Sequence, residues 1–175
     1  MELDRIHVVG APGSGKTWLS SVLGSRSGLP VHNLDDIFWT NESGSYGEKT
    51  PEDERERRLN QLISHARWIV EGVYFNWVVP SFQRADLIIV LETPLIVRDY
   101  RIVRRFVSRG LGNKHVRKES LKNLTDLIRY NHKYEHRYYS ELNGLLKGFH
   151  GKVRRISRTS DATSMISQIS GQMSL

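Results

Sequence analysis

The sequence predicts an α/β domain built around a parallel β-sheet. Short runs of β-prone, mostly apolar residues alternate along the chain with longer stretches that carry apolar residues at helical spacing. This alternation is typical of parallel strands joined by helical crossovers. The clearest strand spans residues 86–91, whose five consecutive apolar residues suit a strand buried on both faces. A chain of 175 residues fits one domain with its own core, so we expect a single domain over residues 1–175.

The first strand, residues 6–9, leads into a phosphate-binding motif. Residues 10–17, here called the phosphate loop, satisfy G-x-x-x-x-G-K-[ST] at every fixed position: Gly10, Ala11, Pro12, Gly13, Ser14, Gly15, Lys16 and Thr17. Glycines let the backbone curl until successive N–H groups point at one anion, and the positive end of the following helix adds to that field. Lys16 can reach the β- and γ-phosphates, and the Thr17 hydroxyl can ligate Mg²⁺. We therefore expect a site for ATP and Mg²⁺, since a glycine-rich helix cap explains neither the Lys-Thr pair nor the strand before it.

Two carboxylates follow the next strand. The first helix is expected over residues 16–27, ending at Gly28, and residues 30–34 then form a short strand. This strand delivers Asp35 and Asp36 at its carboxyl end, where ligands gather in an open α/β sheet. Asp35 is the stronger candidate for contact with Mg²⁺, its water or a substrate hydroxyl. The alternative for both residues is an Asx turn or a helix cap.

A polar segment and an arginine-bearing helix come next. Residues 40–49 contain two glycines and no periodicity, which predicts a mobile loop. A helix then starts at Thr50 and Pro51, with Thr50 as the cap. Its apolar face is formed by Leu59, Leu62, Ile63 and Ala66. Its arginines favour a solvated surface over a hold on a substrate phosphate: Arg55, Arg57 and Arg58.

The third strand, residues 68–72, ends in an acid. Glu71 is conspicuous in an apolar run, and we expect it to hold a magnesium-bound water rather than to lie solvated at the rim. An aromatic cluster follows, and packing is favoured over base stacking, although one ring could line a substrate pocket: Tyr74, Phe75, Trp77 and Phe82.

The helix after the fourth strand is rich in arginine. Arg101 and Arg105 lie four residues apart, as do Arg105 and Arg109, so they share one side of a helix and can converge on one anion. Gly110 and Gly112 then interrupt the helix. A cationic helix followed by a hinge is what a lid over phosphates requires, and we expect Arg101 and Arg105 to act as its clamp.

The last third of the chain contains helical, strand and helical patterns over residues 119–146, 152–157 and from 159 onward. His132 and His136 have metal-ligand spacing, but no further ligand clusters with them, so exposed helix surface is favoured over a zinc site.

Composition and charge exclude several classes of protein. The chain has no cysteine, so it has neither disulfides nor thiolate metal sites. No apolar run approaches the ~20 residues that cross a bilayer, and the N-terminal residues do not resemble a secretory signal. We therefore expect a cytoplasmic protein without membrane contacts. The formal charge of +7 favours polyanionic partners, and residues 98–137 account for it with twelve basic and four acidic side chains.

On these motifs the chain resembles the adenylate-kinase-like P-loop kinases. Within them it is similar to the bacterial DNA topology modulation (FlaR-like) group, because Leu34, Asp35 and Trp39 meet a Leu-Asp-x-x-x-Trp pattern. The resemblance implies a three-layer α/β/α fold with a five-stranded parallel sheet in the order 2-3-1-4-5. It also implies a substrate-binding segment over residues 35–66 and a lid over residues 105–120.

The resemblance assigns roles as well. It gives Lys16 and Thr17 to phosphate and magnesium, Asp35 to substrate or metal, and Arg101 and Arg105 to the clamp. Relatives tend to have Asp-Gly-Asn-Tyr where this chain has Glu71-Gly72-Val73-Tyr74. Glutamate keeps the charge with a longer reach, so metal support survives the change more readily than a hydrogen bond from asparagine does.

Three functions follow from the sequence. The first is an ATP- and Mg²⁺-dependent kinase for a small acceptor, which is a nucleoside, a nucleotide or a similar metabolite. The second is a nucleic-acid-binding protein regulated by nucleotide, prompted by the basic segment, although no known nucleic-acid-binding motif is visible. The third is a nucleoside triphosphatase without an acceptor. The kinase is favoured because a lid explains the same arginines.

Overall fold

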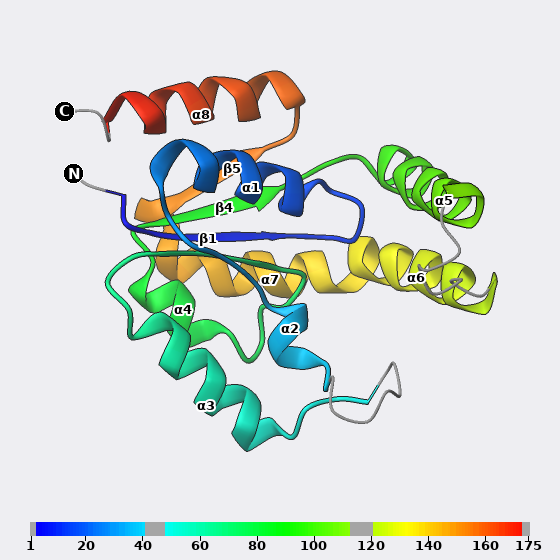
Figure 1. The fold of residues 1–175 in the computed structure, drawn as a ribbon, viewed down its shortest axis with the longest axis horizontal. Helices are drawn as coiled ribbons and strands as arrows, with labels where there is room; N and C mark the ends of the chain where they lie inside the picture. The colour runs from blue at the N-terminus through cyan, green and yellow to red at the C-terminus, as the bar shows by residue number, and fades with distance from the viewer. Residues whose placement is uncertain (1–2, 41–47, 113–120, 173–175) are drawn as a thin grey trace.

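A five-stranded, fully parallel sheet forms the centre of the molecule (Figure 1). The computed structural model describes residues 3–40, 48–112 and 121–172. The strand order is β2-β3-β1-β4-β5, which confirms the predicted fold class and topology. The strands are β1 Arg5–Gly10, β2 Val31–Asn33, β3 Trp68–Gly72, β4 Leu87–Leu91 and β5 Val153–Ile156.

Helices cover both faces of this sheet. Helices α1 and α8 lie on one face, whereas α3, α4 and α7 lie on the other (Figure 1). Helices α5 and α6 pack against each other beyond the carboxyl ends of the strands. The helices are α1 Lys16–Ser27, α2 Asp35–Phe38, α3 Glu52–Ile63, α4 Val79–Arg84, α5 Leu95–Gly112, α6 Leu121–Lys133, α7 Tyr139–Leu146 and α8 Thr159–Gln172, with a π-helical turn at Tyr134–Tyr138 and a 3₁₀ turn at Lys147–Lys152.

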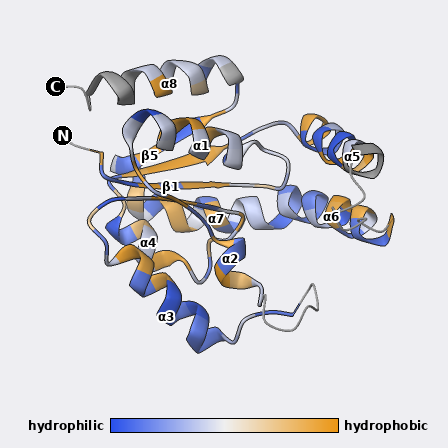
Figure 2. Cartoon of the chain, viewed as in Figure 1, coloured by the Kyte–Doolittle hydropathy of each residue, from blue (hydrophilic) through white to orange (hydrophobic). Residues whose placement is uncertain are grey.

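The three central strands, β3, β1 and β4, are buried on both of their faces, whereas the edge strands β2 and β5 are partly exposed. Along β1, Ile6 and Val8 pack in the core beneath α1 and α8, whereas Val9 packs in the core on the opposite face. Successive side chains of a strand point to opposite faces, so one short apolar run contributes to both cores. Strand β4 is accordingly hydrophobic, and α3 is hydrophilic over most of its length (Figure 2).

The N-terminus of α3 differs from the sequence expectation. Thr50 does not cap the helix, since no side-chain hydrogen bond caps α3 and Pro51 is its N-cap residue. Thr50 instead donates its backbone N–H to the carbonyl of Phe38 (2.9 Å), which buries the residue beside α2. Of the predicted apolar face, Leu59 and Ile63 are buried, while Ala66 lies beyond the helix and is exposed.

The arginine-rich helix also differs from its expectation. Gly110 and Gly112 do not interrupt α5, which continues through Leu95–Gly112. A glycine costs a helix only about 1 kcal/mol relative to alanine, too little to end a helix by itself. The remainder of the predicted lid, residues 113–120, lies outside the described residues, as does most of the predicted loop at 41–47. Within the described part of the chain, no helix is long and apolar enough to span a bilayer.

His7 on β1 is a titratable group inside the core. Its side chain is fully buried, its Nδ1 lies 2.7 Å from the Ser81 hydroxyl, and its ring packs against Phe82. Burial lowers the pKa of His7 to about 3, because the charged form is not solvated there. The folded state therefore holds this imidazole neutral over the acidic range in which the unfolded chain protonates it.

We expect His7 to make the protein acid-sensitive. Its folded-state pKa lies below the unfolded value of about 6.5, so its contribution is complete above that pH and decreases as pH falls from about 6.5 towards 3. Between pH 6.5 and 5, urea denaturation should show the wild-type free energy of unfolding falling about 1.5 kcal/mol more than that of His7→Gln. The exposed His136→Gln variant is the control. Equal pH dependence in wild type and His7→Gln would contradict this assignment.

Candidate active site

The phosphate loop joins β1 to α1 at the carboxyl edge of the sheet. Gly13 and Gly15 have φ angles of 75° and 100°, a region that residues with a Cβ rarely adopt. The loop closes on itself, since the Ser14 N–H bonds the Ala11 carbonyl (3.2 Å). The backbone is therefore curled at the N-terminus of a twelve-residue helix, the arrangement that binds phosphate.

Lys16 lies against this loop. Its side chain is only 8% exposed, and its Nζ donates to the Ala11 carbonyl at 3.0 Å. Burial lowers the pKa of Lys16 to about 8, and the negative charges of Glu71 and Asp35 oppose that shift. Both carboxylates thus act electrostatically on the lysine, so all three groups belong to one site.

Thr17 and Glu71 form a hydrogen-bonded pair of oxygen groups, of which Glu71 is buried and Thr17 is exposed. The Thr17 hydroxyl donates to Glu71 Oε1 at 2.8 Å, and Glu71 is 3% exposed. Burial raises the pKa of Glu71, while the Lys16 charge and the Thr17 hydrogen bond oppose the increase. Among the described residues no three His, Asp or Glu side chains gather as a metal site. Mg²⁺ on a nucleotide needs only one or two protein oxygens besides phosphates and water, so Thr17 and Glu71 fit that ion.

Asp35 is the first residue of α2 and lies beside the same lysine. Tyr74 donates its hydroxyl to Asp35 Oδ1 at 2.8 Å. The pKa of the Tyr74 phenol is raised, chiefly by burial and then by the Asp35 charge. The Asx contact in this turn comes from Asn33, whose side chain accepts the Asp35 N–H (2.9 Å). Asp35 and Asp36 are both exposed, but the Asp35 carboxylate accepts a hydrogen bond from a tyrosine rather than from the backbone.

An aromatic group continues outward from Asp35. Phe38 and Tyr74 stack with centroids 4.5 Å apart, and the Arg55 guanidinium lies 5.0 Å from the Phe38 ring centre and 5.7 Å from that of Trp77. Arg57 and Arg58 instead form ion pairs with Glu54 on the outer surface of α3. Of the three α3 arginines, only Arg55 therefore lies with the rings next to Asp35. The other two aromatic residues of the predicted cluster, Phe75 and Phe82, are buried in the core.

The two predicted clamp arginines behave differently. Arg101 Nη1 donates to the carbonyls of Ser14 (3.1 Å) and Gly13 (3.3 Å), so it contacts the phosphate loop itself. Arg105 is exposed, and its charge contributes to lowering the Lys16 pKa. The side chain of Arg109 lies outside the described part of the structure.

Sequence reasoning missed the role of Arg98. This arginine is 2% exposed, donates from Nη1 to Asn131 Oδ1 at 2.7 Å, and pairs with Glu135. Asn131 in turn donates to Asp99 Oδ1 at 2.7 Å. These partners are more than thirty residues away in the chain, and no local pattern connects them. This network joins α5 to α6 beside the phosphate loop.

A pocket of about 550 Å³ opens on the other side of the loop. It lies between α1, the start of α5 and the turn from β5 to α8, and its exposed lining is mostly apolar. Sequence reasoning missed it because its walls come from three separate parts of the chain. Its lining includes Trp18, Pro94, Val97, Arg101, Ile156 and Arg158.

Comparisons with known proteins identify the fold. No protein-family model and no curated protein matches the sequence. Among solved structures, the chain is similar to shikimate kinase from Acinetobacter baumannii in complex with shikimate, with a TM-score of 0.55 and 19% identity over 95% of this chain and 90% of that one. It is also similar to a gluconokinase from Sinorhizobium meliloti 1021, with a TM-score of 0.55 and 12% identity over 99% and 94%. These likenesses show the fold of P-loop small-molecule kinases and do not show the FlaR-like group.

If Glu71 supports Mg²⁺, removing its charge should weaken the effect of Mg²⁺ on ATP binding without weakening the binding of ATP alone. In Glu71→Gln the side chain keeps its shape and an oxygen acceptor for Thr17, but it loses the negative charge that favours a divalent cation. We expect calorimetric ATP affinity without Mg²⁺ to stay within about twofold of wild type. The gain in affinity on adding Mg²⁺ should fall about tenfold.

The matched control is Asp36→Asn, which removes an exposed carboxylate close to the same site. It should leave the Mg²⁺-dependent gain unchanged. An undiminished gain in Glu71→Gln would show that Glu71 does not support the ion.

Proposed function

We propose that this protein is an ATP- and Mg²⁺-dependent phosphotransferase that passes the γ-phosphoryl group to a hydroxyl of a small acceptor. The observation that carries this proposal is the convergence of three features at one end of the sheet. They are the curled phosphate loop with Lys16, the hydrogen-bonded Thr17–Glu71 pair and the Asp35 carboxylate. The kinase fold of the structural neighbours supports it.

The phosphate loop and Lys16 hold the triphosphate. Backbone N–H groups at the start of α1 and the lysine cation neutralise charge on the β- and γ-phosphates. Thr17 and Glu71 would hold Mg²⁺, which would supply positive charge to offset the charge that develops on the phosphates during transfer. In the transfer, the acceptor oxygen forms a bond to the γ-phosphorus while the bond to the bridging oxygen breaks, and ADP retains that electron pair.

Asp35 serves the acceptor. Its Oδ1 is occupied by the Tyr74 hydroxyl, which fixes the orientation of the carboxylate and leaves Oδ2 to accept the proton of an acceptor hydroxyl. The aromatic group of Phe38, Tyr74 and Trp77 lies next to it, so residues 35–66 together with these rings form the acceptor-binding segment. A carboxylate beside aromatic rings suits a small hydroxylated molecule, which includes the sugar of a nucleoside.

The arginines of α5 complete the site. Arg105 stabilises charge on the transferred group, consistent with its electrostatic effect on Lys16. Residues 105–120 act as a lid that excludes water, which would otherwise hydrolyse ATP. Arg101 contributes positive charge from its position against the phosphate loop, where it also lines the 550 Å³ pocket. That pocket holds the base of the donor, because its mostly apolar lining suits a flat ring.

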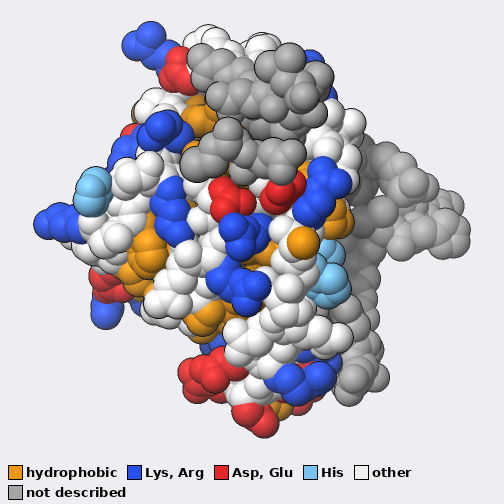
Figure 3. Space-filling view, turned by 90° about the vertical axis from the view of Figure 1, so that its left-hand side faces the viewer, with side chains coloured by type: hydrophobic (Ala, Val, Ile, Leu, Met, Phe, Trp, Pro, Cys, Tyr) orange, Lys and Arg blue, Asp and Glu red, His pale blue; other side chains and the backbone are white. Residues whose placement is uncertain are grey.

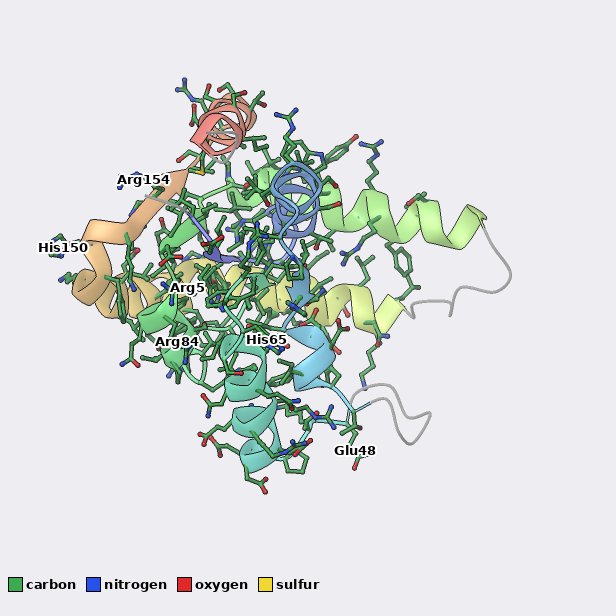
Figure 4. All side chains as sticks on the ribbon, turned by 60° about the vertical axis from the view of Figure 1, so that its left-hand side comes forward. Arg5, Glu48, His65, Arg84, His150 and Arg154 are labelled. Atoms are coloured by element: carbon green, nitrogen blue, oxygen red, sulfur yellow. The ribbon has the colours of Figure 1, made fainter. Side chains whose placement is uncertain are left out.

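A nucleic-acid-binding function receives less support. Arg98 is buried, and the exposed Arg101 is hydrogen-bonded to the phosphate loop, so both already have partners within the protein. On the left-hand side of Figure 1, Lys and Arg side chains are mixed with Asp, Glu and apolar ones (Figure 3). Exposed His150 and Arg154 lie on the opposite side of the molecule from α5 (Figure 4). Among the residues that the structure describes, basic side chains therefore also occur away from α5.

The decisive experiment incubates the purified protein with ATP, Mg²⁺ and a panel of nucleosides, nucleotides, sugars and hydroxy acids, and follows ADP formation. We expect acceptor-dependent turnover that Lys16→Ala abolishes. Asp35→Asn should lower kcat about 100-fold or more, the usual size of a general-base contribution. Arg105→Ala should lower kcat about 100-fold as well, because it removes charge stabilisation.

The matched control is Arg129→Ala, which removes an exposed arginine of α6 that pairs with Asp126. It should retain wild-type turnover. Phosphate release without any acceptor would indicate a hydrolase. No turnover together with tight, salt-sensitive DNA binding would overturn the kinase in favour of the nucleic-acid-binding function.

A further inference from the structure

The outer side of the phosphate loop is hydrogen-bonded by the segment that follows β4. Thr93 lies at the turn between β4 and α5, and its Oγ1 donates to the Ser14 carbonyl at 2.9 Å. Arg101, two turns into α5, donates to the same carbonyl at 3.1 Å. Two side chains from one distant segment therefore hold a single loop carbonyl, and the Arg101 bond to Gly13 adds a second carbonyl.

Holding that carbonyl also orients an amide. The Ser14 carbonyl and the Gly15 N–H belong to one planar trans peptide and point in opposite directions. With the carbonyl held towards α5, the Gly15 N–H is directed to the inner side of the loop. This orientation requires the φ angle of 100° at Gly15. Without the two hydrogen bonds to the Ser14 carbonyl, this glycine could adopt many other φ angles.

The segment that holds the loop is itself fixed. A Cβ built on Gly13 would lie 2.7 Å from the Arg98 carbonyl oxygen, so the loop and the first turn of α5 are already in closest contact. Arg98 is anchored by Asn131 and Glu135 of the following helical hairpin. Thr93 therefore donates from a rigid position, and its hydrogen bond cannot be replaced by movement of α5 towards the loop.

We propose that Thr93 is a positioning residue for the phosphate loop. Its hydroxyl holds the Ser14–Gly15 peptide so that the Gly15 N–H points towards the bound triphosphate. Thr93 also lines the 550 Å³ pocket proposed for the donor base, so its effect on the loop is measured with tripolyphosphate, which has no base. The inference rests on the proposed function in one respect, that this loop binds the triphosphate. It assigns a role to a threonine outside the phosphate-binding motif.

The test separates binding of phosphates from binding of the base. Calorimetry measures the affinity for ATP, for tripolyphosphate and for adenosine, each with Mg²⁺, in wild type, Thr93→Val and Thr93→Ser. Thr93→Val should weaken ATP and tripolyphosphate by the same factor of about five, the size of one lost neutral hydrogen bond, and leave adenosine unchanged. Thr93→Ser restores the hydroxyl and should return both affinities to within twofold of wild type.

The matched control is Thr125→Val. The Thr125 hydroxyl also donates to a backbone carbonyl, that of Lys122 (2.8 Å), but it lies on the exposed surface of α6. It should change none of the three affinities. If Thr93→Val does not fold, Thr93→Ala removes the same hydroxyl without adding a methyl group, and the same comparison applies.

Three results would overturn the inference. The first is an undiminished tripolyphosphate affinity in Thr93→Val. The second is a parallel loss of adenosine affinity, which would show that the substitution acts through the base pocket or through a general structural defect and not through the loop. The third is a failure of Thr93→Ser to restore binding. Failure of the wild-type protein to bind tripolyphosphate at all would instead overturn the proposed function.

Discussion

The close contact between the phosphate loop and the first turn of α5 determines the geometry of the candidate site. It follows from the sheet, because β4 pairs with β1 in a register that places Leu91 beside Gly10. The chain leaving β4 must therefore pass directly along the loop that leaves β1. Gly13 has no side chain, so the backbone of Arg98 can approach until no atom fits between them. The loop, the clamp helix and the pocket beside them all depend on this approach.

Several buried charged side chains lie around this contact. Lys16, Glu71 and Arg98 are each less than a tenth exposed, and removing such charges from water costs several kcal/mol apiece unless other groups compensate. Arg98 is compensated within the protein by Asn131 and Glu135. For Lys16, compensation is only partial, because its pKa is still lowered to about 8 despite two nearby carboxylates. A bound anion such as a phosphate would supply the negative charge that this partly compensated buried lysine still lacks.

The parts of this structure that could be predicted from sequence are those set by local patterns. The apolar run of β4 and the glycine-lysine spacing of the loop each carry their own signal, so fold class and phosphate site could both be stated in advance. Thr50 was assigned as a helix cap because its local pattern is that of a cap, but its pairing with Phe38 is a tertiary contact. Arg98 and Thr93 act on residues 33 to 79 positions away, and one sequence contains no signal for such distances.

The π-helical turn at Tyr134–Tyr138 has a consequence for comparing this chain with others. One turn there contains an extra residue, so everything after it is rotated by about 100° relative to an uninterrupted α-helix. This offset lets Glu135 pair with Arg98 while Tyr139, four residues later, bonds Glu92 at the end of β4. A homologue with a regular helix would need one residue fewer here. A single-residue gap at this point of an alignment would therefore correspond to the π-helical turn.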